Sequence, residues 1–225
     1  MINIVCVLKS GGVYNASYAL ALSKGVRTNI TIPYQFFCLT DFDSAELPGI
    51  DVIPLLYDWS GWWSVAEAWG PGLPRQRTLY IDLDTLVTGN LNDIAQFDKS
   101  NICCLEDFYF SGNPANGIMN FAPGALEPFW RVLRDTPKKW INEGGRMKPP
   151  HFGNMIFWKY RQLLQVELPV FWQETLPGQV VSYKVHCRNQ EALPEGARLV
   201  CSHGTPKPPD IEDSWYKKLW LEYTT

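Results

Sequence analysis

Continuous apolar runs alternate with amphipathic segments along the first half of the chain. Residues 2–8 (INIVCVL) are all but continuously apolar and predict a buried strand, and the next segment has helical spacing that we expect to end at Gly25. Further strands are expected at residues 34–40, 51–56, 78–84 (TLYIDLD) and 101–107 (NICCLED). Strands of this kind are typical of a mostly parallel sheet covered on both faces, so the pattern predicts an α/β fold.

The second half of the chain is less regular. Strands are expected at residues 117–124, 180–187 (VVSYKVHC) and 197–202, and helices at residues 127–136, 152–164 and 214–223. The last helix is amphipathic, so we expect it to pack on the sheet, with peripheral membrane contact as a weaker reading. No linker composition interrupts residues 1–225, which favours one domain.

Composition and charge exclude several classes of protein. The 225 residues are 46% hydrophobic and 14% aromatic, enough for a packed core, and the net charge of -3 with scattered basic residues is unlike that of a nucleic-acid binder. No apolar run is long enough to span a membrane, and the N-terminus reads as a strand rather than a signal peptide. Six cysteines without C-x-x-C spacing do not predict zinc, and we expect a cytoplasmic protein.

Two carboxylates interrupt the apolar run at residues 80–87 (YIDLDTLV). In a strand Asp82 and Asp84 project to the same side, and they lie at a carboxyl end, where α/β sheets bind ligands. The pair repels itself unless a cation lies between the side chains, and oxygen ligands suit Mg²⁺ or Mn²⁺ bound together with a diphosphate. The alternative is that one aspartate caps the following turn and the other is exposed to solvent.

Five stretches of the chain carry a family resemblance: residues 62–65 (WWSV), 80–91 (YIDLDTLVTGNL), 116–124 (NGIMNFAPG), 176–188 (LPGQVVSYKVHCR) and 202–209 (SHGTPKPP). In this order they make the chain similar to the family-8, glycogenin-like glycosyltransferases, above all the small bacterial or phage members. The resemblance implies a GT-A fold, a Rossmann-like, mostly parallel sheet flanked by helices. It also implies a nucleotide-binding half at about 1–107 and a donor and acceptor half at about 108–225.

The implied activity is metal-dependent transfer of a sugar, with retention of configuration, from a nucleotide diphosphate donor. A UDP-sugar is the expected donor, and a glycan or glycolipid is a possible acceptor. By resemblance Asp82 and Asp84 are the metal-binding D-x-D, His203 is the third protein ligand, and Lys207 contacts the donor diphosphate, with Gly204 in the same element. This element is shorter than the family pattern and has Pro209 in place of tryptophan.

Other implied contacts surround this centre. The loop after the first strand would receive the base and ribose, which makes Leu8, Lys9 and Tyr14 candidates, and Arg77 would suit a diphosphate or a base edge. Candidates for contact with the donor sugar are Asp107, Asn116, Gly117, His151 and Asn154. The last two belong to HFGNMIF (residues 151–157), which stands where the family has an Asp-Gln pair. Val65 likewise replaces the usual lysine.

Two other functions are open at this stage. The missing Asp-Gln pair favours a GT-A homologue that binds nucleotides or carbohydrates without catalysing transfer. A haloacid-dehalogenase-like phosphatase, with Asp82 as nucleophile, would explain DLDTL, but its motif has a glycine and follows the first strand. The tryptophans between residues 59 and 69 are expected in the core, with an acceptor-binding patch as the alternative.

Overall fold

The computed structural model describes residues 1–145 and 166–225, so the helix expected at residues 152–164 lies outside the described residues. The strands are β1 (Ile2–Leu8), β2 (Tyr34–Thr40), β3 (Asp51–Pro54), β4 (Thr78–Ile81), β5 (Thr85–Val87), β6 (Ile102–Glu106), β7 (Pro114–Phe121), β8 (Val170–Phe171), β9 (Val180–Ser182) and β10 (Leu199–Cys201). The α-helices are α1 (Ala16–Asn29), α2 (Asn92–Ala95), α3 (Glu127–Asp135), α4 (Pro137–Gly145), α6 (Trp172–Thr175) and α7 (Ser214–Thr224). Shorter helical turns are η1 (Ser44–Glu46), η2 (Gly61–Trp69), η3 (Tyr183–Cys187) and η4 (Pro208–Asp210).

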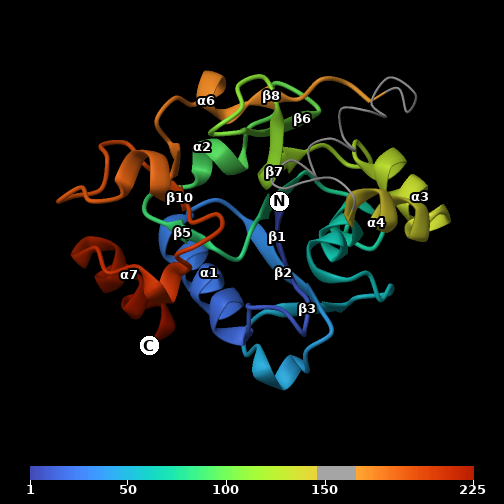
Figure 1. Ribbon diagram of the computed structural model, residues 1–225, viewed down its shortest axis with the longest axis horizontal. Coiled ribbons are helices and arrows are strands. Elements are labelled where there is room, and N and C mark those ends of the chain that lie inside the picture. Colours follow the sequence, from blue (N-terminus) through green and yellow to red (C-terminus); the bar gives the residue numbers. More distant parts are fainter. Residues whose placement is uncertain (146–165) are drawn as a thin grey trace.

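A seven-stranded, mostly parallel sheet forms the centre of the molecule, in the order β3-β2-β1-β4-β7-β6-β8 (Figure 1). The strands from β3 to β4 pair in parallel, and β7 runs antiparallel to both β4 and β6. The proline-containing strand β3 lies at one edge of this sheet. This arrangement confirms the α/β fold class. A second sheet, β5-β10-β9, was not predicted, because its strands are only three residues long and β5 pairs with β10 across more than one hundred positions of sequence.

Both faces of the large sheet are buried. Along β1 the side chains of Ile4, Cys6 and Leu8 pack in one core with α1, α7 and the small sheet, while Val5 and Val7 pack in a second core on the other face. The second core includes residues of η2 and α3. This two-sided burial is the physical reason that β1 reads as a continuous apolar run rather than an alternating one.

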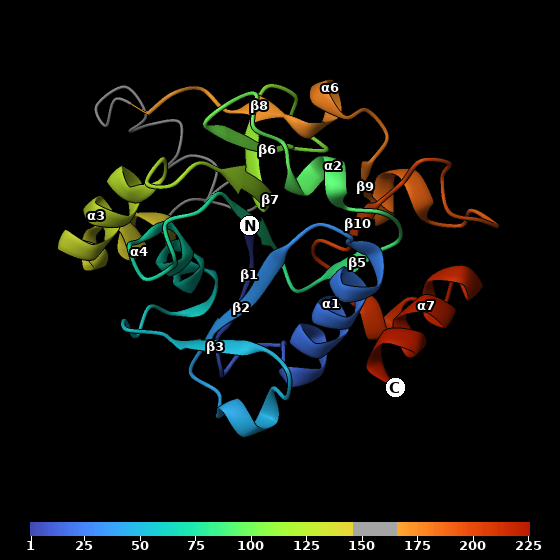
Figure 2. The same ribbon diagram turned by 180° about the vertical axis from the view of Figure 1, so that it is seen from behind.

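The C-terminal helix α7 lies beside α1 (Figures 1 and 2). Tyr216, Trp220 and Tyr223 are buried, so the apolar face of α7 is already covered by protein, chiefly by α1 rather than by the sheet. The membrane contact considered for this helix stays a prediction. The close packing also corrects the expected end of α1: the helix continues through Gly25 to Asn29. A Cβ on Gly25 would lie 3.0 Å from the Tyr223 ring.

The tryptophans in and just before η2 are mainly structural. Trp59 and Trp63 are buried in a third core with Trp130 of α3 and Trp140 of α4, which confirms the core interpretation for these two residues. Figure 2 shows α3 and α4 on the side of the molecule opposite to α7. Trp62 is different: its ring is stacked on Trp63 with centroids 4.3 Å apart, but the residue is 46% exposed.

Two predicted strands are shorter than expected. The strand at residues 78–84 ends at Ile81, and the D-x-D lies in a turn in which Thr85 N–H donates to the Asp82 carbonyl at 3.1 Å. The strand at residues 180–187 ends at Ser182, and the chain then closes into the wide turn η3. The Ser182 hydroxyl caps this turn by accepting from Val185 N–H at 3.3 Å. A capping side chain thus overrides a strand-like sequence.

Candidate active site

The chemistry-bearing side chains follow the carboxyl ends of five strands. Lys9 follows β1, Asp82 follows β4 and Asp107 follows β6 in the large sheet, while Lys184 and His203 follow β9 and β10 in the small one. Because the carboxyl ends of β1 and β4 meet at one edge of the large sheet, residues remote in sequence come together there. Residues that follow strands of both sheets, among them Asp82, Asp107 and His203, line one cavity.

The D-x-D turn is buried against β7. Asp82 N–H donates to the Gly117 carbonyl at 2.8 Å, and a Cβ on Gly117 would lie 3.2 Å from Asp82 Oδ2, so only glycine leaves the carboxylate its full space. The hydroxyl of buried Tyr80 donates to Asp82 Oδ1. Burial and the neighbouring charge of Asp84 raise the pKa of Asp82 to about 7. An added positive charge at this turn would relieve the repulsion.

Asp84 has a positive neighbour within the chain. Lys207 Nζ lies 2.5 Å from Asp84 Oδ2 and donates to the Tyr14 hydroxyl at 2.6 Å, and Tyr14 in turn donates to Asp84 Oδ2 at 2.8 Å. Burial, followed by the charge and hydrogen bond of Asp84, raises the pKa of Tyr14. Lysine, tyrosine and aspartate therefore form one connected group that joins the loop after β1, the D-x-D turn and the segment after β10.

His203 is held in a defined orientation. Its Nε2 lies 2.8 Å from the hydroxyl of fully buried Ser182, its ring is stacked on Phe108 with centroids 5.7 Å apart, and Tyr109 contacts it edge-on. Burial and the charge of Lys184 lower the pKa of His203, which favours the neutral imidazole that metals bind. With Nε2 engaged by Ser182, Nδ1 is the nitrogen left for a ligand.

The candidate metal ligands have the right chemistry for a divalent cation, but their side chains are not already arranged around one point. Asp82, Asp84 and His203 line one cavity and offer hard oxygen donors and a neutral imidazole. Lys207 already places a positive charge on Asp84. Within residues 1–145 and 166–225, however, no three His, Cys, Asp or Glu side chains converge closely enough to form a ready-made metal cluster. The metal assignment of these three residues stays a prediction.

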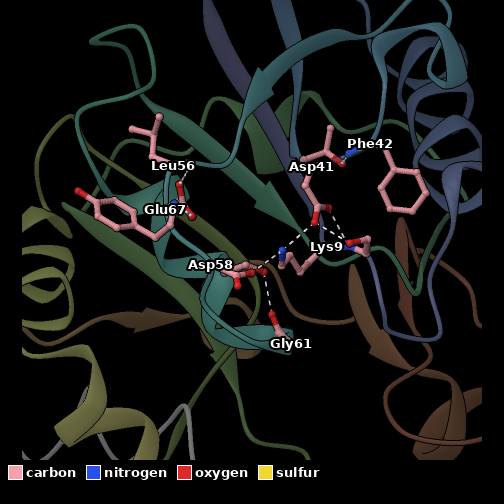
Figure 3. Close-up of polar contacts among 11 residues, drawn as sticks. Lys9, Asp41, Phe42, Leu56, Asp58, Gly61 and Glu67 are labelled. Carbon is pink, nitrogen blue, oxygen red and sulfur yellow. Dashed lines mark hydrogen bonds and ion pairs between the residues drawn. The ribbon is translucent and has the colours of Figure 1, made fainter.

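The loop after β1 is fixed by carboxylates (Figure 3). Lys9 Nζ lies 2.7 Å from Asp41 Oδ2 and 3.0 Å from Asp58 Oδ1, and Asp41 also accepts from the backbone N–H and the hydroxyl of Ser10, at 2.8 and 2.6 Å. Although burial opposes it, the bonds from Lys9 and Ser10 lower the pKa of Asp41 to about 2. Lys9 is thus committed to two carboxylates, while Leu8 is a fully buried core residue that offers a ligand only its backbone.

A third carboxylate orders the chain that carries Asp58. Glu67 of η2 is buried and accepts from Leu56 N–H at 2.7 Å and from Tyr57 N–H at 3.1 Å, as Figure 3 shows for Leu56. Burial raises the pKa of Glu67. The segment between β3 and η2 is thereby held against the loop after β1.

Two cavities meet at Asp82. The first, of about 590 Å³, is lined by the loop from Lys9 to Tyr14, by Asp58 and by Trp62. The second, of about 450 Å³, is lined by Asp84, His203 and Lys184 and by the aromatic residues after β6. Asp82 contributes to both linings. Their arrangement suits an elongated ligand whose charged middle lies at the D-x-D turn.

The remaining candidates fall in different places. Asp107 lines the second cavity and its Oδ1 caps a turn by accepting from Tyr109 and Phe110 N–H. Gly117 and Gly204 line this cavity too, whereas Asn116 lines neither cavity and its buried Oδ1 has no hydrogen-bond partner in the described part of the chain.

Arg77 lies at the other end of β4, where it donates to Asn120 Oδ1 at 2.8 Å and to the Ser100 carbonyl at 3.2 Å. It precedes the four-residue strand whose far end carries Asp82, so its position is structural and corrects its assignment to the nucleotide site. His151 and Asn154 lie outside the described residues.

Sequence reasoning missed Lys184 and Ser182 as site residues. Both lie in the stretch read as a continuous strand, where alternation alone does not distinguish a side chain that points into a cavity from one in solvent. The only available signal was their position in the stretch at residues 176–188, within the family resemblance.

Solved glycosyltransferase structures share this architecture. The chain is similar to the glycosyltransferase GlyE of Streptococcus pneumoniae TIGR4, with a TM-score of 0.67 at 16% identity over 100% of this chain and 61% of that one. It is also similar to the galactosyltransferase LgtC in complex with donor and acceptor sugar analogs, with a TM-score of 0.66 at 12% identity over 99% and 96% of the two chains. The chain has the GT-A glycosyltransferase fold.

The bifunctional glycosyltransferase WbbM is a further structural neighbour, at a TM-score of 0.65 and 12% identity, and this chain spans 49% of its length. No protein-family model matches the sequence, and no curated protein sequence does. No helix in the described part of the chain has the length and apolar character needed to cross a membrane.

Proposed function

We propose that the protein is a metal-dependent glycosyltransferase that transfers a sugar, with retention of configuration, from a nucleoside diphosphate donor, a UDP-sugar, to a glycan or glycolipid acceptor. The observation that carries the proposal is that Asp82, Asp84 and His203 line one cavity at the carboxyl ends of the strands, with Lys207 bound to Asp84. The proposal includes a cytoplasmic location, which the six free cysteine thiols support.

Transfer breaks the bond between the anomeric carbon of the sugar and the terminal phosphate oxygen, and the bonding electrons stay with the phosphate. The acceptor hydroxyl oxygen bonds to the anomeric carbon, and its proton passes to the departing phosphate oxygen. Negative charge therefore grows on the diphosphate, and fixed positive groups beside it lower the barrier. A divalent cation held by Asp82, Asp84 and His203 would stabilise the same charge as a Lewis acid when bound.

The chain's own residues divide the work by position. The first cavity, with the Lys9 loop fixed by Asp41 and Asp58, would bind the nucleoside. Lys207, between Tyr14 of that cavity and Asp84, would bind the phosphates, and the tyrosine hydroxyl orients both partners. The second cavity, with Asp107 on its wall, would receive the donor sugar and the acceptor hydroxyl.

A first experiment measures the midpoint of thermal unfolding with uridine, guanosine, cytidine and thymidine diphosphates, each with and without Mn²⁺. A ligand that binds only the native state raises the midpoint, so one nucleotide should give a metal-dependent shift. A well-folded protein that shifts with none of them would refute the proposal. Binding without turnover of any donor sugar would instead favour the alternative of a homologue that binds without transfer.

The metal assignment is tested by Asp84→Asn. The variant keeps the volume of the side chain but loses one anionic metal ligand, so we expect the Mn²⁺-dependent part of the thermal shift and the transferase activity to disappear. Asp51→Asn is the matched control, because Asp51 is exposed on the edge strand β3. Retention of full metal-dependent activity in Asp84→Asn would remove the metal site from the proposal.

A further inference from the structure

The second cavity contains a lysine that the reaction scheme above does not use. Lys184 follows β9 at the start of η3, is half-buried and lines the cavity with Asp84 and His203. A Cβ built on Gly204 would lie 2.8 Å from Lys184 Nζ, so the ammonium group lies directly over the backbone next to His203. The left-handed conformation of Gly204, with φ of +71°, and the absence of its side chain together leave room for this contact.

The two lysines of the site differ in their partners. Lys207 is bound to Asp84 and Tyr14, whereas no carboxylate in the described part of the chain lies within 4 Å of Lys184 Nζ. A half-buried ammonium without an anionic partner has lost part of its hydration and gains most from an anionic ligand. Lys184 is therefore placed to bind an anion that enters the second cavity.

The arrangement of the cavities indicates which anion. Tyr14 lines the first cavity, and Asp84 lines the second cavity together with Lys184. Lys207 contacts both Tyr14 and Asp84, so its ammonium group lies where the two cavities join. A nucleotide whose base lies in the first cavity therefore meets Lys207 before it meets Lys184. Along such a ligand the phosphate next to the ribose comes first, and the phosphate that carries the sugar comes second.

We propose that Lys184 is a catalytic residue that binds the terminal, sugar-bearing phosphate of the donor and stabilises it as the leaving group. This inference rests on the proposed function. As the bond to the anomeric carbon breaks, its electron pair remains on the phosphate oxygen beside Lys184 Nζ, and the proton from the acceptor hydroxyl arrives on the same phosphate. Lys207 serves the phosphate next to the ribose, so the two lysines have separate tasks.

The test compares a nucleoside diphosphate with its monophosphate. The nucleoside diphosphate with the largest thermal shift is titrated into the full chain in the presence of Mn²⁺, with calorimetric detection. The corresponding monophosphate is then titrated in the same way. Lys184→Met should weaken diphosphate binding about 10- to 100-fold, the worth of a charge-assisted hydrogen bond, and change monophosphate binding less than about twofold. Lys184→Arg should restore much of the loss.

Two further variants make the comparison decisive. Lys184→Gln removes the charge with a polar side chain and should repeat the result of Lys184→Met, so one poorly folded variant does not end the test. Lys218→Met, at an exposed position of α7, changes the net charge equally and should change neither affinity. Turnover should show a fall in kcat for Lys184→Met that exceeds any rise in KM for the acceptor.

Several outcomes would overturn the assignment. Equal losses for both nucleotides would mean that Lys184 binds the phosphate next to the ribose or acts only on the fold. If the nucleotide affinities of Lys184→Met are unchanged and its KM for the acceptor rises, Lys184 binds an anionic group of the acceptor instead. If the KM for an acidic donor sugar rises, Lys184 binds the acidic group of that sugar. A wild type that binds no nucleoside diphosphate would refute the proposed function along with this inference, whereas normal binding by Lys184→Met would refute the inference alone.

Discussion

Asp41→Asn perturbs the group that fixes the loop after β1. Asp41 accepts three hydrogen bonds, from Lys9 Nζ at 2.7 Å, Ser10 N–H at 2.8 Å and the Ser10 hydroxyl at 2.6 Å, and its side chain is 26% exposed. An asparagine of the same size accepts through one oxygen only, and its amide group opposes the lysine. The variant therefore removes the charge and most of the bonds without leaving a cavity.

The expected loss follows from the pKa of the carboxyl group. Its fall from the ordinary value of 3.8 to about 2 corresponds to about 2 kcal/mol of folding free energy at neutral pH, since one pKa unit is worth about 1.4 kcal/mol. Because the pKa is lowered in the folded state, this contribution is complete above about pH 5 and disappears as the pH falls toward 2. About half of it should be lost by pH 3.

Urea unfolding at pH 7 and pH 3, followed by tryptophan fluorescence, measures the effect. Asp41→Asn should lower the free energy of unfolding by about 2 kcal/mol at pH 7 and by about half as much at pH 3, while the control Asp51→Asn should change it by less than about 0.5 kcal/mol. A loss of the same size at both pH values would refute the electrostatic reasoning and point to a distorted loop.

Two further changes test the packing around the site. Gly25→Val places a Cβ 3.0 Å from the Tyr223 ring and should lower the free energy of unfolding in urea by about 1–3 kcal/mol, because it pushes α1 away from α7. Gly72→Val is the control, since a Cβ there would have no atom within 4 Å, and it should lower the free energy less. Equal losses for the two variants would contradict the packing argument. Glu67→Ala leaves the Leu56 and Tyr57 N–H groups without their acceptor, so it should lower the free energy of unfolding by about 2–3 kcal/mol and speed proteolysis of the segment before η2. Glu222→Ala, at an exposed position, is the control. A stable, protease-resistant Glu67→Ala variant would show that Glu67 does not order this segment.

The α/β fold was predictable because its evidence is local. A strand buried on both faces must be apolar at nearly every position, and β1 meets this requirement at every position except Asn3. Asp82 and Asp84 stood out for the same reason, since carboxylates are costly within such a run. The prediction that they share one face of a strand was wrong, because hydrogen bonds from Asp82 to Gly117 and from Ser202 to Asp84 hold them in a turn.

Other features depend on pairings that no local pattern contains. Gly25 looks like the end of a helix, but its close contacts with Val87 and with Tyr223, almost two hundred residues away, explain a glycine within α1. The small sheet also depends on contacts between distant parts of the chain, because β5 and β10 pair across more than one hundred residues. Arg77 precedes the D-x-D strand closely in sequence, yet the extended strand carries the two ends apart.

The sequence by itself determined the sheet, the covered faces and the presence of a carboxylate pair at a strand end, because these follow from the cost of burying polar groups and from the period of a strand. Only the tertiary structure decided the partners of those carboxylates. Lys207 forms an ion pair with Asp84, and Lys9 forms ion pairs with Asp41 and Asp58. Lys184 lines the second cavity. Charges act through space, so which lysine is neutralised and which is available to a ligand depends on distances that the order of residues does not contain.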